Sequence, residues 1–410
     1  MRLGTERQTA IATHARRIRD TDDAIEVAAR LAAELAPGAV ERDRGGEVPR
    51  DALAALDASG LLGITVPASD RGAGLGPVAL AEVVRRLAVA DPAIAQVPQG
   101  HYLCMDVLGL LGTDHQRRRL YADALGGARF GSALAERGGA HAQELRTRLR
   151  CEDGRLVLRG HKHYCTGALT ARWLPVSALD EHERLVLVFV PTSAPGLTLD
   201  DEWHAMGQRA TVSGAVVLDD VVVDPGLVVP YWQAFQGPQL IGARAQLVHA
   251  AIEVGIARAA LDDASTFLRE RARPFFEPVR RGLIEHATDD PYALVRLGRL
   301  AAKVAAAESL LRDAAGVVEG LPLAPTSAVV AAEGSLAVAA AKAFGSDVAV
   351  EVTTDLFAIT GASGTDRRLG LDRHWRNART HSVHDPVDWK YHHLGAFAAT
   401  GALPPSHGQI

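Results

Sequence analysis

Apolar residues in the first third of the chain recur with the period of an amphipathic helix. Between positions 25 and 35 they mark one helix face, and Pro37 predicts its end. A second stretch of this kind runs through 77–90. The pattern Thr113-x-x-Gln116 predicts a capping box at the start of a third helix. The N-terminal part of the chain is therefore expected to be helical.

The pattern changes near Arg129. From there to about Pro230, short apolar runs rich in Val, Leu and Thr are separated by Gly, Pro and Asp. Such runs predict antiparallel β-structure. Helical spacing returns after Pro238. It predicts long helices over 241–273, 291–319 and 328–359, and shorter ones after Gly370 and Pro386.

A helical part, a β module and a long helical bundle follow one another along 410 residues. This length is too great for one compact core. The sequence predicts a mainly α fold with a central β module, in three domains at 1–128, 129–236 and 237–410. The most apolar stretch, 327–345, is interrupted by Glu333 and Lys342, which predicts a buried helix and not a membrane span.

Composition excludes several classes of protein. A net charge of −5 gives no indication of a nucleic-acid surface. The first twenty residues lack the apolar segment of a secretory signal. The three cysteines have no CxxC spacing, which is typical of free thiols in a reducing compartment. A cytoplasmic protein is expected.

Several local strings resemble those of acyl-CoA dehydrogenases, in the same order and at matching spacing. They lie at 62–67, 133–138, 160–167, 206–209 and 217–223. The C-terminal strings at 371–386, 389–392 and 404–408 are similar to those of the sulfur-acquisition oxidoreductases of this fold, a group related to dibenzothiophene and alkanesulfinate monooxygenases. The resemblance implies an acyl-CoA dehydrogenase-like fold.

The same resemblance implies a function. Members of this group use reduced FMN and dioxygen, through a C4a-hydroperoxyflavin, to oxygenate small organosulfur compounds of the sulfinate, sulfide or thiophene type. A separate NAD(P)H-dependent reductase supplies the reduced FMN, and the enzyme is a homotetramer. FAD is the less favoured cofactor, because the chain has no GxGxxG fingerprint for a dinucleotide.

Asp385 takes the position at which dehydrogenases of this fold carry a glutamate base. Asp is one methylene shorter, and proton abstraction tolerates little misplacement. The Asp385-Pro386 pair therefore argues against a dehydrogenase. An alternative interpretation of this pair is a helix N-cap followed by a first-turn proline.

His384 is the candidate for handling a proton beside the flavin. By resemblance it faces the flavin, with Asp385 orienting it, and an imidazole can hold or donate a proton near neutral pH. His381 lies three residues earlier and would share its helix face. Two alternatives remain open: a metal pair completed by Asp385, and a pair of surface or packed histidines. No metal is predicted, because no third spaced ligand is evident.

The resemblance also assigns the remaining site residues. It implies reaction roles for His384, Asp385 and His101, and flavin contacts at Ser132, Thr166, Gly167, Trp203, Arg271, Ser363 and His381. Each has a structural alternative: a core histidine for His101, a strand residue for Thr166, a core aromatic for Trp203 and a solvated helix end for Arg271.

Two positions depart from the pattern of the relatives. Ser132 stands where many carry Asn, and Ser363 stands where many carry Arg, with Arg367 and Arg368 close behind it. Phosphate needs cationic or N–H donors, so these changes bear on flavin affinity. They keep open a flavin-free scaffold as an alternative, beside an N-hydroxylase or an acyl-CoA dehydrogenase of the same fold.

Overall fold

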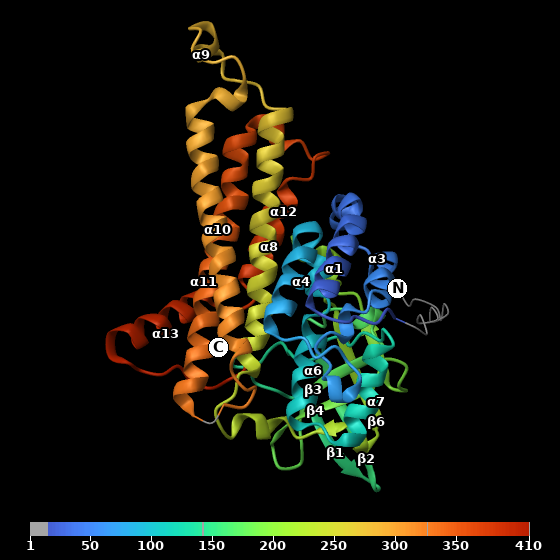
Figure 1. Cartoon of the computed structure of the whole chain (residues 1–410). Helices are drawn as coiled ribbons and strands as arrows, with labels where there is room; N and C mark the ends of the chain where they lie inside the picture. Colours follow the sequence, from blue (N-terminus) through green and yellow to red (C-terminus); the bar gives the residue numbers. More distant parts are fainter. Residues whose placement is uncertain (1–14, 142, 326, 410) are drawn as a thin grey trace.

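The computed structural model describes residues 15–141, 143–325 and 327–409. Part of the stretch searched for a secretory signal, residues 1–14, lies outside this range. A long helical bundle stands beside a smaller part, in which the N-terminal helices pack on a sheet (Figure 1). The observed order of helices, sheet and bundle is the one predicted from the sequence.

The N-terminal helices begin and end largely at the expected signals. Asp91 accepts hydrogen bonds from the first backbone N–H groups of the helix that follows it, and Thr113 forms the predicted capping box with Gln116. The helices are α1 (Thr21–Leu35), α2 (Ala39–Gly45), α3 (Arg50–Ala58), α4 (Pro77–Ala90), α5 (Pro92–Gln96), α6 (Gln99–Leu111) and α7 (Asp114–Leu125).

The β module is one seven-stranded sheet with the order β5-β6-β2-β1-β3-β4-β7. Its strands are β1 (Arg148–Glu152), β2 (Arg155–Lys162), β3 (Trp173–Leu179), β4 (Leu185–Pro191), β5 (Leu197–Asp200), β6 (Ala215–Val223) and β7 (Val228–Val229). All pairings are antiparallel except that of β1 with β3. The segment around residues 130–135 joins the sheet only through isolated bridges, of which the two to β3 are parallel. The antiparallel prediction was therefore wrong for these bridges and for the pairing of β1 with β3.

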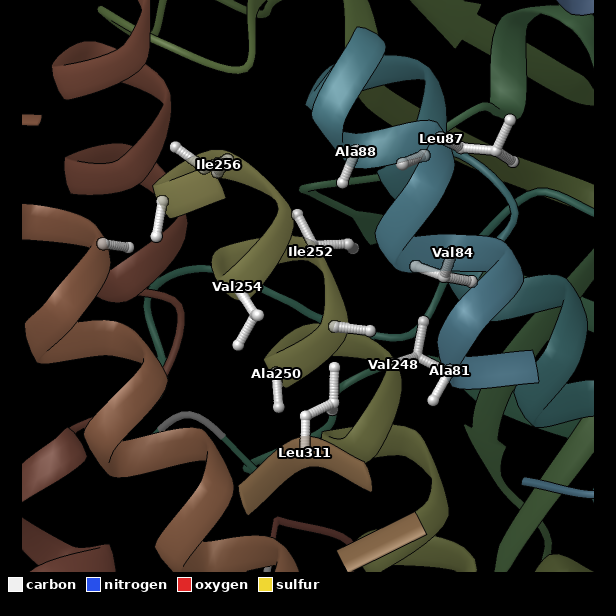
Figure 2. Close-up of a cluster of buried hydrophobic side chains, with 14 of the residues drawn as sticks. Ala81, Val84, Leu87, Ala88, Val248, Ala250, Ile252, Val254, Ile256 and Leu311 are labelled. Carbon is white, nitrogen blue, oxygen red and sulfur yellow. The ribbon is translucent and has the colours of Figure 1, made fainter. Parts of the chain in front are cut away.

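The bundle contains α8 (Ile241–Glu270), α10 (Pro291–Glu319) and α11 (Ala328–Thr360), with α9 (Phe276–Arg280) at its far tip and α12 (Asp372–Ser382) and α13 (Val387–Thr400) against its side (Figure 1). The central helix is α8, which packs on α4, α10 and α11. Val248 and Ile252 of α8 lie toward α4, while Ala250 lies on the side of Leu311 of α10 (Figure 2). Burial of this apolar surface joins the N-terminal helices to the bundle.

Gly255 allows the close approach of α8 to α4. A Cβ atom at this position would lie 2.6 Å from Ala88 Cβ and 2.7 Å from the carbonyl oxygen of Arg85. Such contacts leave no room for any larger residue. The middle of α8 therefore lies directly against α4.

Helix α11 is long and apolar enough to cross a membrane by length and composition. Most of its apolar window, 61%, is buried inside the protein, as is usual for the core helix of a bundle. Lys342, which interrupts the apolar run, is fully buried and points to a partner in α8. This agrees with the prediction of a buried helix.

Candidate functional site

A chain of hydroxyl groups lies at the end of β2. Ser132 N donates to Thr166 O at 3.0 Å. Thr166 Oγ1 lies 2.8 Å from Ser213 Oγ, which lies 2.8 Å from Thr211 Oγ1, and Thr211 donates to the carbonyl oxygen of Gln208 at 2.7 Å. The proton of Thr211 is therefore committed. When Ser213 donates to Thr166, the half-buried Thr166 can turn its own O–H outward to a ligand.

Two aromatic residues flank this hydroxyl chain. The Trp203 indole donates to Gln208 O at 2.8 Å and meets Tyr164 edge-on, with ring centroids 6.4 Å apart. Tyr164 is 49% exposed and has a φ of 58°, a left-handed conformation that costs free energy for a residue with a side chain. Trp203 is half-buried, so it is not the core aromatic that was one alternative. Strain and exposure together make Tyr164 a further candidate for ligand contact.

The loop before this cluster is clasped by α12. A Cβ atom on Gly207 would lie only 2.0 Å from the carbonyl oxygen of Arg376. Gln208 N donates to Asn377 Oδ1 at 2.5 Å, and Arg376 donates to Met206 O at 2.9 Å. Neither end of the Gln208 amide has a hydrogen-bond partner among the described residues, although the residue is only 3% exposed. An unpartnered buried amide is costly, which favours a polar ligand beside it.

His381 of α12 turns into the bundle. Its Nδ1 lies 2.8 Å from Glu253 Oε1, and its Nε2 lies 3.2 Å from both His249 Nδ1 and Gln96 Oε1. Burial lowers the pKa of His381 and lowers the pKa of His249 further. Both imidazoles are therefore neutral near pH 7.

Glu253 forms a fully buried ion pair. Its Oε1 lies 2.5 Å from Lys342 Nζ, and neither side chain is exposed to solvent. Ser346 donates to Glu253 Oε2 at 2.7 Å. Burial alone would raise the pKa of Glu253, but Lys342 and the bond from His381 outweigh burial and lower it.

His384 lies at the edge of this cluster. Its ring stacks on His249 with centroids 4.3 Å apart and 28° between the planes, and its side chain is 46% exposed. His384 Nδ1 is 3.8 Å from Asp385 Oδ1, beyond direct hydrogen-bond distance. His384 lies beyond Ser382, where α12 ends, so it does not share a helix face with His381 as predicted. Both rings instead contact His249.

Asp385 is held as a carboxylate. Its side chain is 3% exposed and lies 2.8 Å from Lys390 Nζ of α13. Burial would raise its pKa, but His384, Lys342 and Lys390 together hold the pKa far below its usual range. The alternative interpretation of Asp385 as a helix N-cap is wrong, because α13 begins at Val387 without a side-chain cap.

The hydroxyl chain and the histidine cluster border the same segment between α5 and α6. Gln96 contacts His381, as described above. The next residue, Val97, would contact a Cβ atom on Gly167 at 2.9 Å, and a Cβ atom on Gly100 would lie 3.2 Å from Ser132 Cβ. Residues predicted from the two distant halves of the chain are thus brought to one place.

Comparison with known proteins identifies the family. Residues 15–128, 132–221 and 247–389 match the N-terminal, middle and C-terminal domains of acyl-CoA dehydrogenases. The dibenzothiophene monooxygenase of Rhodococcus erythropolis is 32% identical over 402 residues, covering 93% of this chain and 94% of that protein. The chain belongs to the acyl-CoA dehydrogenase family. Within this family it is also 31% identical to the probable FMNH2-dependent monooxygenase SfnC of Pseudomonas putida, over 93% of this chain and 96% of SfnC.

Solved structures of this family agree with the fold. FMN-bound TdsC from Paenibacillus sp. A11-2 matches with a TM-score of 0.89 and 29% identity, covering 94% of this chain and all of that chain. Methanesulfinate monooxygenase MsuC from Pseudomonas fluorescens matches with a TM-score of 0.88 and 30% identity, over 94% of this chain and 99% of that chain. The predicted resemblance and fold class are confirmed.

Three predicted site residues of this family member lie away from the two clusters. His101 is fully buried in α6, with Nε2 2.8 Å from Leu62 O and Nδ1 accepting from Phe130 N at 3.3 Å. Burial lowers its pKa to about 4. Both ring nitrogens are occupied by the backbone, so His101 matches the alternative of a core histidine.

Arg271 and Ser363 lie at the other end of the bundle, where α8 and α11 end. Both are exposed. Arg271 makes no ion pair with any residue in the described ranges. Arg368, one of the two arginines that follow Ser363, is paired with Asp366. These positions can contact only a ligand that reaches this end of the bundle.

The residues that sequence reasoning missed include Tyr164 and Gln208 beside the hydroxyl chain, and His249, Glu253, Lys342 and Gln96 in the histidine cluster. Lys342 was noticed only as an interruption of an apolar run. Glu253 is the matching interruption in the apolar stretch of α8. A charged residue in a buried helix face needs a partner, and this signal could have flagged both residues. Their pairing across 89 residues of sequence was not deducible.

Proposed function

We propose that this chain is a monooxygenase that uses reduced FMN and dioxygen to oxygenate a small organosulfur compound of the sulfinate, sulfide or thiophene type. The observation that carries this proposal over a dehydrogenase is the state of Asp385. A dehydrogenase of this fold needs a carboxylate that can take a proton from the substrate. Asp385 is buried against Lys390, and its pKa is held far too low for that task.

The names of the relatives support the cofactor and the substrate class. TdsC is described with FMN bound, SfnC is described as FMNH2-dependent, and MsuC acts on methanesulfinate. FMN is therefore the proposed cofactor, with FAD less favoured. A separate NAD(P)H-dependent flavin reductase is the proposed source of reduced FMN.

The chain's own residues fit a flavin. The Thr166 hydroxyl, which is free to donate when Ser213 donates to it, and the unpartnered amide of Gln208 suit a ring edge that carries both donors and acceptors. Tyr164 and Trp203 provide an aromatic wall beside them. Reduced FMN supplies the electrons that activate dioxygen. The protein's part is to orient the ring, exclude water and manage protons.

His384 is the proposed proton-handling residue. It is the exposed member of the histidine cluster, and a carboxylate that stays ionised lies beside it. A ring in this position can hold or donate a proton where oxygen chemistry takes place. Arg271 and the Ser363 loop are proposed to serve the flavin phosphate of a neighbouring subunit in a homotetramer.

The proposal is tested by flavin binding and by product analysis. Reduced FMN should bind more tightly than FAD. With reduced FMN and oxygen, methanesulfinate or dibenzothiophene should yield a sulfur-oxygenated product, whereas a primary amine and butyryl-CoA should remain unchanged. Hydroxylation of the amine would favour the N-hydroxylase, dehydrogenation of butyryl-CoA would favour the dehydrogenase, and binding of neither flavin would favour the scaffold.

A further inference from the structure

The Glu253–Lys342 pair has no assigned role, and stability does not explain it. Two charges at zero exposure lose their hydration, and apolar residues of similar volume usually serve a core as well or better. Resting on the function proposed above, we propose that Glu253 and Lys342 are positioning residues of the reaction. They fix which ring nitrogens of His381 and His249 carry protons, and so leave His384 as the imidazole that handles the proton of the reaction.

The proton on His381 is fixed by the contacts of Glu253. Its Oε1 receives Lys342 Nζ at 2.5 Å and His381 Nδ1 at 2.8 Å, and its Oε2 receives Ser346 Oγ at 2.7 Å. All three partners can act as donors, which only an ionised carboxylate accepts on both oxygens. His381 therefore carries its proton on Nδ1.

His249 must follow His381. Lys342 already balances the charge of Glu253, and His381 is buried, so His381 stays neutral and its Nε2 is a bare acceptor. His249 Nδ1, 3.2 Å away, can then only donate. Gln96 is compatible with this arrangement, because rotation of its amide brings the NH2 group to His381 Nε2.

The outcome is a neutral imidazole beneath His384. His249 stacks on the His384 ring at 4.3 Å. A protonated His249 would repel a proton on His384 at this distance, whereas a neutral one does not. The charges facing the cluster from the other elements balance: Glu253 of α8 with Lys342 of α11, and Asp385 with Lys390 of α13.

The arrangement is an anchor and not a proton relay. From His384 the contacts lead inward through His249 and His381 to Glu253. Beyond it, Lys342 and Ser346 are buried at 0% and 2% exposure. Within the described part of the chain this branch ends in the core, and the other contact of His381 is the amide of the half-buried Gln96, which is not a titratable group. The effect of the arrangement on the reaction is therefore to fix tautomers.

The test removes both charges together. Glu253→Gln/Lys342→Met keeps the shapes and the net charge, and avoids leaving one buried charge alone. The matched control is Glu136→Gln/Lys162→Met in the β module, another buried pair, with 2.6 Å between Lys162 Nζ and Glu136 Oε1 and side-chain exposures of 0% and 5% for Lys162 and Glu136. No histidine ring contacts the control pair among the described residues.

Two readouts are compared in full-length protein. Oxygen consumption and hydrogen peroxide release with reduced FMN and methanesulfinate give the coupling. Two-bond proton–nitrogen NMR correlations in protein labelled with 15N-histidine, assigned with His249→Asn and His381→Asn, give the tautomers. The bundle double variant should raise peroxide release about three- to tenfold and convert the fixed Nδ1-protonated pattern of both histidines into an averaged one. The control should change neither readout.

The results separate this inference from the proposed function. If the bundle variant keeps the wild-type tautomers, or loses them with coupling intact, Glu253 and Lys342 are only structural. If the wild-type enzyme oxygenates no sulfur compound, the proposed function fails. The NMR comparison then still decides whether the pair fixes the tautomers.

Discussion

Two buried lysine–glutamate pairs, one in the sheet and one in the bundle, have nearly the same geometry and different surroundings. In the β module, Glu136 also accepts from Thr147 Oγ1 at 2.7 Å and from two backbone N–H groups. Lys162 donates to Ser177, and Ser177 donates to Leu134 O. Apart from the ion pair itself, every hydrogen bond of the two side chains is made with the backbone or with a hydroxyl group. We call this pair closed, because none of these partners leads to another titratable group.

The bundle pair is open on one side. Glu253 accepts one hydrogen bond from Ser346 and another from His381. His381 in turn contacts His249, whose ring stacks on that of His384. The comparison shows that burial and charge alone do not indicate function. On our proposal, the partners of the pair decide whether it only holds the fold together or also sets the state of a reactive group.

The largest expected effect tests the similarity of the pairs. Lys342→Met and Lys162→Met should each lower the free energy of unfolding by about 3–5 kcal/mol, because each leaves an uncompensated buried carboxylate. Urea denaturation followed by circular dichroism measures the loss. A loss below about 1 kcal/mol in either variant would show that this pair is not desolvated in the way described.

The second prediction tests the reactive end of the open pair. His384→Ala should leave folding and FMN affinity nearly intact while product formation per oxygen consumed falls by roughly ten- to a hundredfold, because one polarised hydrogen bond is worth about 1.5–3 kcal/mol. Peroxide release measures the shift. Asp385→Asn should give a milder effect. His161→Ala removes another exposed histidine, whose ring lies 4.2 Å from that of His163 in the β module at a tilt of 44°, and should not alter coupling. Equal coupling in His384→Ala and wild type contradicts the proposal.

The third prediction uses pH. Burial lowers the pKa of His249 and His381, so below about pH 6.5 the unfolded chain takes up protons that the folded protein does not. The stability present above that pH is lost as pH falls, by up to about 1.4 kcal/mol per pH unit for each histidine. His249→Gln should reduce this slope in urea denaturation between pH 7 and 5.5. Glu136→Gln/Lys162→Met should change the slope less than His249→Gln. No histidine is hydrogen-bonded to this pair, and its nearest effect is on His163, whose pKa burial lowers and the Glu136 charge raises.

The smallest effect concerns the hydroxyl groups. Thr166→Val should weaken FMN binding about two- to tenfold, the value of one neutral hydrogen bond, measured by fluorescence titration. Ser177→Ala removes a hydroxyl from the closed pair and should leave FMN affinity unchanged. The opposite result would place the flavin contact elsewhere than the Thr166 chain.

Much of the fold could be read from local signals. The helix predicted over 77–90 is α4, and the one predicted over 291–319 is α10, because a proline at the first turn marks the start of each. The parallel contact of β1 with β3 was not predicted. Periodicity reports which face of a strand is buried, but not which strand lies beside it.

The candidate site was only partly predictable. His381 and His384 were identified within one short string, whereas their partners lie on α8 and α11, more than 30 residues away in sequence. In the sequence, Lys342 and Glu253 are each a single charged residue in an apolar helix. Only the packing of α11 against α8 shows that these two charged residues form an ion pair. His101 was assigned a role by the same resemblance as His384, although it lies in none of the matching strings, and its hydrogen bonds to the backbone make it a core residue.

The contact of Gly207 with the carbonyl oxygen of Arg376 has a consequence for engineering. The backbone of the loop at Gly207 packs directly against the backbone of α12. The distance between the loop before the hydroxyl chain and α12, which carries His381, therefore cannot be adjusted by changing side chains. A variant library aimed at bulkier sulfur compounds should vary the side chains around the hydroxyl chain and the histidine cluster, and leave this backbone contact unchanged. Segments transferred from relatives should include both 206–208 and 376–377, since replacing only one of them would disturb the contact between the two.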